Sequence, residues 1–174
     1  RAAGAEAVIG TASAGKLDRI REVGLPLDLG VDRASASFAD EVWRHTAGAG
    51  VNVILDTVGA SYWEANLASL ATRGRLVIVG LLGGSTIQAD LRKLMSKRAT
   101  IVGTVLRSRT LAEKAQVTAD FRERFLAAFV ADDKGQRPRL IPIIDRIYPL
   151  VDASEAHRRM ESNDSFGKVL LKID

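Results

Sequence analysis

The chain has 174 residues, of which 47% are apolar and 26% are charged, with a net charge of +4, as expected of an ordinary globular domain and not of a disordered or fibrous chain. It contains no cysteine and two widely separated histidines, which excludes disulfides and thiolate ligands and argues against a histidine-based metal site. No apolar run reaches the ~20 residues of a membrane span, and acidic and basic residues are interspersed, so neither a membrane nor a nucleic acid is an expected partner.

Short apolar strands alternate with helices along most of the chain. Ser13 is a suitable N-cap for a helix that Gly24 ends. The runs 51–56 and 75–79 lack strict alternation and are rich in branched residues, which is typical of strands buried on both faces of a sheet. The predicted strands cover residues 5–10, 27–29, 51–56, 75–79 and 100–103, and the predicted helices cover residues 14–23, 38–45, 62–70, 91–97 and 111–130.

This alternation predicts an α/β fold with a doubly wound parallel sheet. Right-handed crossovers place the C-terminal ends of all such strands at one edge, and ligands bind at that edge. We therefore expect four residues to lie along the same edge, because each follows a different strand or ends it. They are Ser13, Asp56, Gly80 and Leu106.

The sequence changes character near residue 135. Prolines recur between residues 138 and 149, so residues 140–150 are expected to form extended segments and not a central strand. A capped helix over 154–161 and a final strand over 168–173 follow. We therefore predict a cofactor-binding domain over 1–135 and a C-terminal segment over 136–174 that returns to another domain or covers the sheet.

Four stretches occur in an order and spacing that resemble a known family. They are VNVILDTVG at 51–59, GRLVIVG at 74–80, EAHRRME at 155–161 and GKV at 167–169. Together they resemble the medium-chain dehydrogenase/reductase superfamily, and specifically its zeta-crystallin-like quinone oxidoreductases. The segments 106–109 and 145–150 resemble the animal tumour-suppressor-inducible members of that group.

The resemblance implies a Rossmann-type cofactor domain that follows a GroES-like catalytic domain. It also implies that the first Rossmann strand and the glycine-rich turn precede Arg1, so that the chain is truncated at its N-terminus and inactive by itself. The activity that it implies is zinc-independent transfer of hydride from NADPH to a quinone or a related α,β-unsaturated carbonyl. A homodimer through the Rossmann domain and a cytoplasmic location complete these expectations.

The end of the first predicted strand bears on the cofactor. An NAD-binding fold places an acidic residue there, whose carboxylate binds the ribose hydroxyls. Here Ser13 and Lys16 stand at the start of a helix, where anions are favoured, and no acidic residue is present. They match the family's positions for the 2′-phosphate of NADPH. The alternative is a plain N-cap beside a solvated lysine.

The family also implies a role for residues after the later strands. Asp56 either contacts the cofactor or bonds the backbone amides of a turn, and the loop that begins at Gly80 either lies beside the nicotinamide or is a flexible strand exit. Further predicted cofactor contacts are Val58 near the adenosine, Leu81 and Leu82 in that loop, Val105 and Leu106 as an apolar wall, and Ser165 and Lys168 in the tail.

One departure concerns a tyrosine that the family often places near the adenosine phosphate. Val31 stands at that position in this chain, and Arg33, two residues further on, is a substitute for the tyrosine. No catalytic side chain is predicted, because the cofactor supplies the hydride and the protein supplies orientation and exclusion of water.

Two other functions remain open at this point. The chain could belong to an enoyl reductase module of a fatty-acid or polyketide synthase, which shares the fold and the cofactor. It could also be a non-catalytic nucleotide-binding or dimerisation unit. The residues that precede Arg1 would distinguish these functions.

Overall fold

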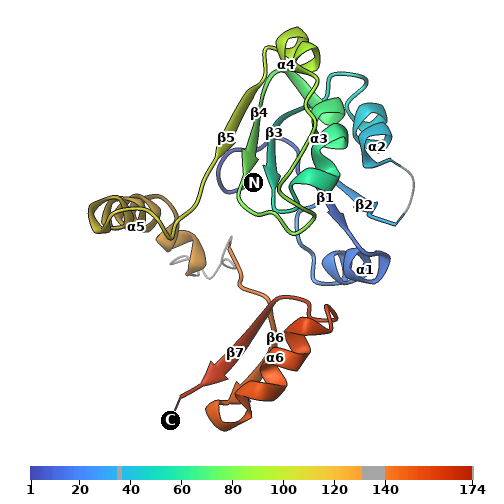
Figure 1. Cartoon of the computed structure of the whole chain (residues 1–174). Helices are drawn as coiled ribbons and strands as arrows, with labels where there is room; N and C mark the ends of the chain where they lie inside the picture. The colour runs from blue at the N-terminus through green and yellow to red at the C-terminus, as the bar shows by residue number, and fades with distance from the viewer. Residues whose placement is uncertain (35–36, 131–139, 174) are drawn as a thin grey trace. The chain divides into compact units, whose positions relative to one another are not determined.

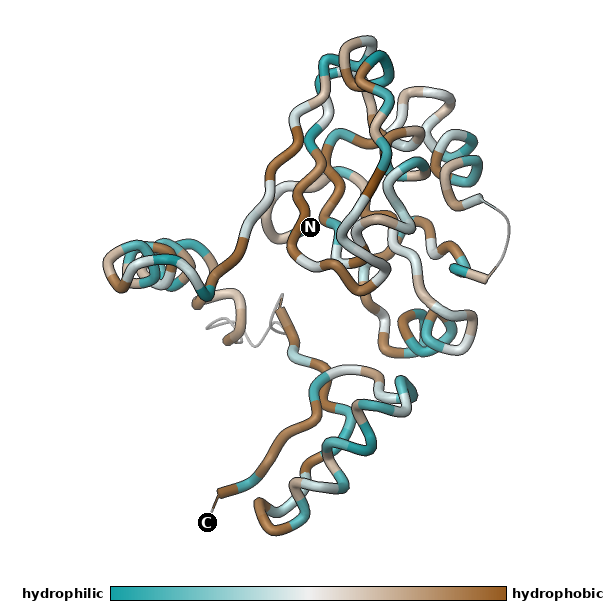
Figure 2. The backbone as a smooth tube through the Cα atoms, viewed as in Figure 1, coloured by the Kyte–Doolittle hydropathy of each residue, from teal (hydrophilic) through white to brown (hydrophobic). Residues whose placement is uncertain are grey.

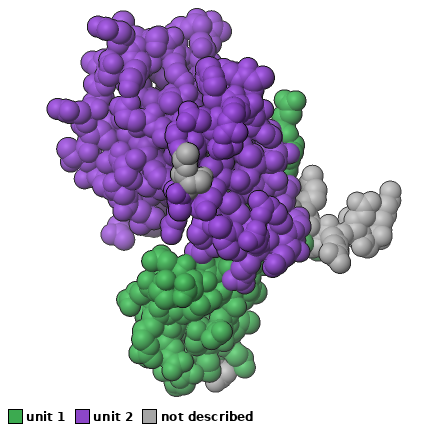
Figure 3. All heavy atoms as spheres, turned by 90° about the vertical axis from the view of Figure 1, so that its right-hand side faces the viewer, with its two compact units in different colours: residues 1–6, 115–174 green, residues 7–114 purple. Residues whose placement is uncertain are grey.

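A computed structural model describes residues 1–34, 37–130 and 140–173 (Figure 1). The chain divides into a larger unit of residues 7–114 and a smaller unit of residues 1–6 and 115–174 (Figure 3). The domain boundary predicted near residue 135 lies outside the described residues and stays a prediction. No helix in the described part of the chain is long and apolar enough to cross a membrane.

The larger unit alternates strands and helices, as predicted. The elements are β1 (Ile9–Ala12), α1 (Ala14–Glu22), β2 (Leu29–Asp32), α2 (Phe38–His45), β3 (Val51–Asp56), the 3₁₀ helix η1 (Ala60–Tyr62), α3 (Trp63–Ser69), β4 (Leu70–Ile78), α4 (Leu91–Lys97) and β5 (Thr100–Gly103). The helix predicted over 111–130 is α5 (Leu111–Phe125), which crosses from the larger unit into the smaller one, and the 3₁₀ helix η2 (Leu126–Phe129) follows it.

β4 begins five residues before the predicted strand. Its first residue, Leu70, pairs with Val51 of β3, and an irregularity in register separates this pair from the next one at Val53 and Arg75. Arg73 has φ +63° within this irregularity. The polar and glycine-containing residues 72–74 concealed the early start, because the pairing of Leu70 with Val51 joins segments that are distant in the sequence.

All described strand pairs are parallel, which confirms the predicted fold class. β3, β4 and β5 form one sheet, and β1 and β2 form another. Asp56 pairs with Ile78, and the amide N of Val79 donates to the carbonyl O of Asp56 at 2.8 Å. Asp56 and Gly80 therefore lie at the same edge of the sheet, as expected.

Helices α3 and α4 cover one face of the three-stranded sheet. Trp63 and Leu67 of α3 form a buried cluster with Leu76 of β4, and Ile54 and Leu94 pack against it. Figure 2 shows apolar residues concentrated along these strands. In the described structure no helix covers the opposite face of the sheet. The prediction that residues 51–56 are buried on both faces is therefore wrong. The side chains of Val53 and Leu55 there are 63% and 69% exposed.

The smaller unit contains a βαβ arrangement of its own. It consists of β6 (Ile144–Pro149), the 3₁₀ helix η3 (Leu150–Asp152), α6 (Ala153–Glu161) and β7 (Lys168–Lys172), and β6 and β7 are parallel. Arg159 of α6 binds both carboxylate oxygens of the buried Asp145 of β6, at 2.9 and 3.1 Å. This hydrogen bond to Asp145 raises the pKa of Arg159 and fixes the helix against the strand.

Gly50 makes the entry into β3 possible. Its φ is +75°, and an added Cβ would lie 2.7 Å from the carbonyl O of Ser69 and 2.9 Å from the amide N of Ala71. Its own amide donates to the Thr46 hydroxyl at 2.9 Å, which fixes the turn that follows α2. A side chain at this position would meet both steric conflict and left-handed backbone strain.

Gly50→Ala is therefore expected to lower the free energy of unfolding by at least about 2 kcal/mol, since the left-handed conformation alone costs ~1–2 kcal/mol in a residue with a Cβ. The control is Gly15→Ala in α1, where an added Cβ meets nothing within 4 Å. That change should stabilise the helix by about 0.5–1 kcal/mol. Urea denaturation followed by circular dichroism measures both, and equal effects would contradict the assignment.

Candidate functional site

The candidate site lies where the parallel strands of the larger unit end. β1 and β2 end together, because Ala12 pairs with Asp32 and the amide of Arg33 donates to the carbonyl O of Ala12 at 2.9 Å. One hollow at this edge is lined by residues from both sheets, namely residues at the exit of β2 and residues after β3. The exits of β3, β4 and β5 share the edge through their parallel register.

Ser13 occupies the N-cap position of α1. Its carbonyl accepts from the amides of Lys16 and Leu17 at 2.9 and 3.0 Å, but its hydroxyl makes no capping hydrogen bond. Among the residues that the structure describes, the Lys16 ammonium makes no hydrogen bond or ion pair, and the residue is half-buried. A hydroxyl and an ammonium group are thus available at the first turn of a helix, which attracts anions.

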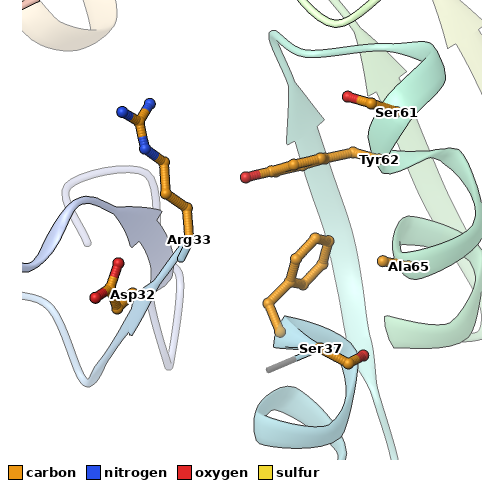
Figure 4. Close-up of a pocket in the computed structure, with 7 residues that line it drawn as sticks. Asp32, Arg33, Ser37, Ser61, Tyr62 and Ala65 are labelled. Carbon is orange, nitrogen blue, oxygen red and sulfur yellow. The ribbon is translucent and has the colours of Figure 1, made fainter. Parts of the chain in front are cut away.

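The hollow at the exits of β2 and β3 has a volume of about 180 Å³. Arg33 extends along one side and Tyr62 faces it from the other, with its hydroxyl directed toward Arg33 (Figure 4). The ring of Phe38 lies 5.0 Å from that of Tyr62. The hollow is lined by Asp32, Arg33, Ser37, Phe38, Ser61, Tyr62 and Ala65.

The structure distinguishes Val31 from Arg33. Val31 is 3% exposed and belongs to the core, whereas Arg33 lines the hollow. The carboxylate of Asp32 accepts from the amide of Ala34 at 3.0 Å. Sequence reasoning missed Phe38, Tyr62 and Ser61 as lining residues. The sequence did contain a signal for them. Phe38 directly follows the N-cap of α2, and Ser61 and Tyr62 follow the exit of β3.

Asp56 ends β3 and is 5% exposed. One carboxylate oxygen accepts from the amides of Val58 at 2.7 Å and Gly59 at 3.1 Å, and the other accepts from the same Gly59 amide and from the side-chain amide of Asn66, at 3.1 and 3.0 Å. This is the turn geometry that the sequence left as the alternative to a ligand contact. Asp56 therefore fixes loop 57–59, and a direct contact of its carboxylate with a cofactor stays a prediction.

The loop after β4 packs against the loop after β3. The amides of Leu82 and Gly83 donate to the carbonyls of Thr57 and Val58, at 3.3 and 2.7 Å. An added Cβ on Gly80 would lie 2.8 Å from the Thr57 carbonyl O. The glycines of this loop thus permit one backbone segment to approach another, while Leu81 and Leu82 project outward with 53% and 89% exposure.

The exit of β5 adds an apolar segment to the same edge. The amide of Thr104 donates to the carbonyl of Ile78 at 3.0 Å, which continues the ladder beyond β5. Val105 and Leu106 follow and are 59% and 61% exposed. The predicted residues of the larger unit are thus at strand exits that share an edge. Ser165 and Lys168 lie in the smaller unit, so their part in the same site stays a prediction.

Residues 27–171 match the profile of the zinc-binding dehydrogenase family. The chain is also similar to a curated relative, the mycocerosic acid synthase-like polyketide synthase of Mycobacterium tuberculosis, at 28% identity over 173 residues. This match covers 99% of the chain and 8% of the synthase. The similarity therefore concerns a small part of a much longer protein.

Among the solved structures with the same fold, one is a complex with NADPH and another is an NAD-dependent enzyme. A mycobacterial quinone oxidoreductase is 31% identical, with a TM-score of 0.71 over 95% of this chain and 49% of its own. A mycobacterial protein complexed with NADPH is 28% identical, with a TM-score of 0.71 over 96% and 50%. An NAD-dependent alcohol dehydrogenase is 26% identical, with a TM-score of 0.69 over 97% and 44%. The chain spans about half the length of these structures.

Ser13→Ala should change the free energy of unfolding by less than about 0.5 kcal/mol, because the Ser13 hydroxyl caps nothing. The matched control is Asp90→Ala, since the Asp90 carboxylate caps α4 by accepting from the amide of Arg92 at 2.9 Å. That change should cost about 1 kcal/mol. If urea denaturation gave equal losses for both variants, the Ser13 hydroxyl would be a structural cap and not an available ligand group.

Proposed function

We propose, from the premise that this chain belongs to the zinc-binding dehydrogenase family of medium-chain dehydrogenases/reductases, that it is the cofactor-binding part of an NADPH-dependent quinone oxidoreductase. The reaction is hydride transfer from NADPH to a quinone or a related α,β-unsaturated carbonyl. The similarity to a mycobacterial quinone oxidoreductase at 31% identity supports this assignment. Closeness to the animal tumour-suppressor-inducible members stays a prediction.

The family name implies zinc, but the residues of this chain do not fit a zinc site. Cysteine is absent, and the two histidines, His45 and His157, are far apart in the sequence. Within residues 1–34, 37–130 and 140–173, no group of three or more His, Cys, Asp or Glu could hold a metal ion. The proposed reaction therefore takes no step through zinc bound by this chain.

The choice of NADPH rests on one observation, the residues at the exits of β1 and β2. β1 ends at Ala12 and is followed by Ser13 and Lys16, so the carboxylate that would bind an NAD ribose and repel a phosphate is absent from this position. The backbone amide of Arg33 donates to the carbonyl O of Ala12, so Arg33 follows β2 at the edge where Ser13 follows β1. A hydroxyl, an ammonium and a guanidinium group form a suitable site for a 2′-phosphate.

The hollow beside these groups suits the adenosine end of the cofactor. Aromatic rings and a guanidinium plane are the side chains on which bases stack, and Tyr62, Phe38 and Arg33 supply them. Asp56 fixes loop 57–59, because its carboxylate accepts hydrogen bonds from two backbone amides of that loop. We assign it to positioning, since its oxygens bond donors within the protein.

The nicotinamide end is assigned to the exits of β4 and β5. Bound NADPH supplies the hydride. Leu81, Leu82, Val105 and Leu106 are exposed apolar side chains that would form a wall against the ring and exclude water. Ser165 and Lys168 complete the proposed set from the smaller unit. We assign no catalytic acid or base in this chain.

Other proposals concern the assembly and the wider protein. β5 pairs only with β4 among the described strands, so its other edge is available for the proposed homodimer. The absence of cysteine supports a cytoplasmic location.

An enoyl reductase module is the second candidate function, and the polyketide synthase relative, which matches 173 residues, favours it.

Lys16→Ala should weaken NADPH binding roughly ten- to a hundredfold, because a hydrogen bond to a charged group contributes ~1.5–3 kcal/mol. NADH binding should change far less, because NADH has no 2′-phosphate. The control is Arg21→Ala, in the last turn of the same helix. Calorimetry with both cofactors measures the difference, and equal weakening of NADPH and NADH would refute the proposed 2′-phosphate role.

The 174-residue chain by itself should not reduce quinones, whereas the natural polypeptide that contains it should. Catalysis requires both reactants to be held at reacting distance, and this chain spans about half the length of the solved relatives. A turnover assay with NADPH and a simple quinone makes the comparison. Turnover by the chain alone at an ordinary ~10 per second would contradict the proposal.

A further inference from the structure

The hollow at the exits of β2 and β3 contains two hydrogen-bond donors that face each other. In Figure 4 the hydroxyl of Tyr62 points toward the guanidinium group of Arg33. Among the residues that the structure describes, neither the hydroxyl nor the guanidinium makes a hydrogen bond or ion pair. Arg33 follows β2, whereas Tyr62 ends η1, which follows β3. A ligand that enters between them therefore meets donors from two different sheets.

The backbone of η1 is fixed by the loop that follows β4. The amides of Ala60 and Ser61 donate to the carbonyl O atoms of Gly84 and Gly83, at 2.9 and 3.2 Å. Tyr62 is the next residue, so its position over the hollow is set before any ligand binds. A donor that is already held in place loses less conformational entropy on binding than a mobile one.

The ring of Tyr62 is supported as well. Its centroid lies 5.0 Å from that of Phe38, the first residue of α2, with an angle of 45° between the two planes. Both residues are half-buried. The aromatic contact holds the ring, while the hydroxyl at its end remains directed into the hollow (Figure 4).

The charges around the hollow indicate why a donor is useful on this side. The carboxylate of Asp32 lines the hollow on the same side as Arg33, where it accepts from the amide of Ala34 at 3.0 Å. Its negative charge opposes the binding of an anion there. Tyr62 lies on the other side of the hollow, and its hydroxyl is neutral and able to donate.

We propose that Tyr62 is a specificity-determining residue of the cofactor site, whose hydroxyl donates a hydrogen bond to the 2′-phosphate of NADPH from the side opposite to Arg33. This inference rests on the function proposed above and adds a ligand group from the exit of β3. A phosphate has several acceptor oxygens, and hydrogen bonds to a charged group are the strong ones. NADH has a neutral hydroxyl at this position and gains much less from the same donor.

A role of the aromatic ring alone leads to a different expectation. Stacking of the adenine base on the Tyr62 ring would serve NADPH and NADH equally, since both contain the same base. The hydroxyl and the ring can therefore be separated by a change that removes only the hydroxyl.

Tyr62→Phe in the natural polypeptide makes that change, because it keeps the ring and its contact with Phe38. NADPH affinity should fall roughly tenfold, as for the loss of a hydrogen bond to a charged group, and NADH affinity should stay the same. Calorimetry with each cofactor measures both. The matched control is Tyr148→Phe, the same change at a buried residue of β6 outside the hollow, which should leave both affinities unchanged.

Equal weakening of both cofactors by Tyr62→Phe, or no change in either, would overturn the proposal. The variant Lys16→Ala separates this failure from that of the proposed function. If Lys16→Ala weakens NADPH selectively and Tyr62→Phe does not, only the role of Tyr62 is wrong. If neither variant is selective, the 2′-phosphate site itself is wrong.

Phosphorus NMR of bound NADPH provides a readout that a merely structural role would not change. A hydrogen bond donated to the phosphate dianion favours the charged form and lowers the pKa of the 2′-phosphate. With saturating NADPH, the 2′-phosphate bound to Tyr62→Phe should therefore take up its proton at a higher pH than that bound to the unchanged protein. Identical titration curves for the two proteins would overturn the proposal.

Discussion

The parallel pairing of β3 with β4 and of β4 with β5 is the constraint on which the candidate site depends. Because the strands share one direction and one register, the segments after Asp56, Ile78 and Gly103 leave the sheet at the same edge. Residues far apart in the sequence thus become neighbours. The buried Asp56 then shapes this edge, because its carboxylate binds the amides of the following turn and the side chain of Asn66.

The charge at the strand exits links this architecture to the proposed cofactor. Ser13 and Lys16 begin α1, and Arg33 joins them through the pairing of β1 with β2. The hydroxyl of Ser13 makes no capping bond, which leaves it available at a position where the helix favours an anion. The same edge carries apolar side chains at its other end, so it combines a polar and an apolar region.

One face of the three-stranded sheet is covered by helices, and the other face is exposed. Trp63 and Leu67 bury one face through contacts with Leu76, whereas Leu55 on the other face remains largely exposed. Among the described strands, β3 pairs with β4 alone. The chain spans about half the length of the solved relatives.

The sequence by itself determined the alternation of strands and helices, their parallel arrangement and the edge shared by Asp56 and Gly80, because apolar periodicity and glycine positions are local signals. Only the tertiary structure decided the roles of individual side chains. It buried Val31, brought Arg33 and Tyr62 to one hollow and exposed Leu55, since these outcomes depend on which elements pack together. Likewise, the early start of β4 at Leu70 depends on pairing with Val51, a contact between segments that no local pattern encodes.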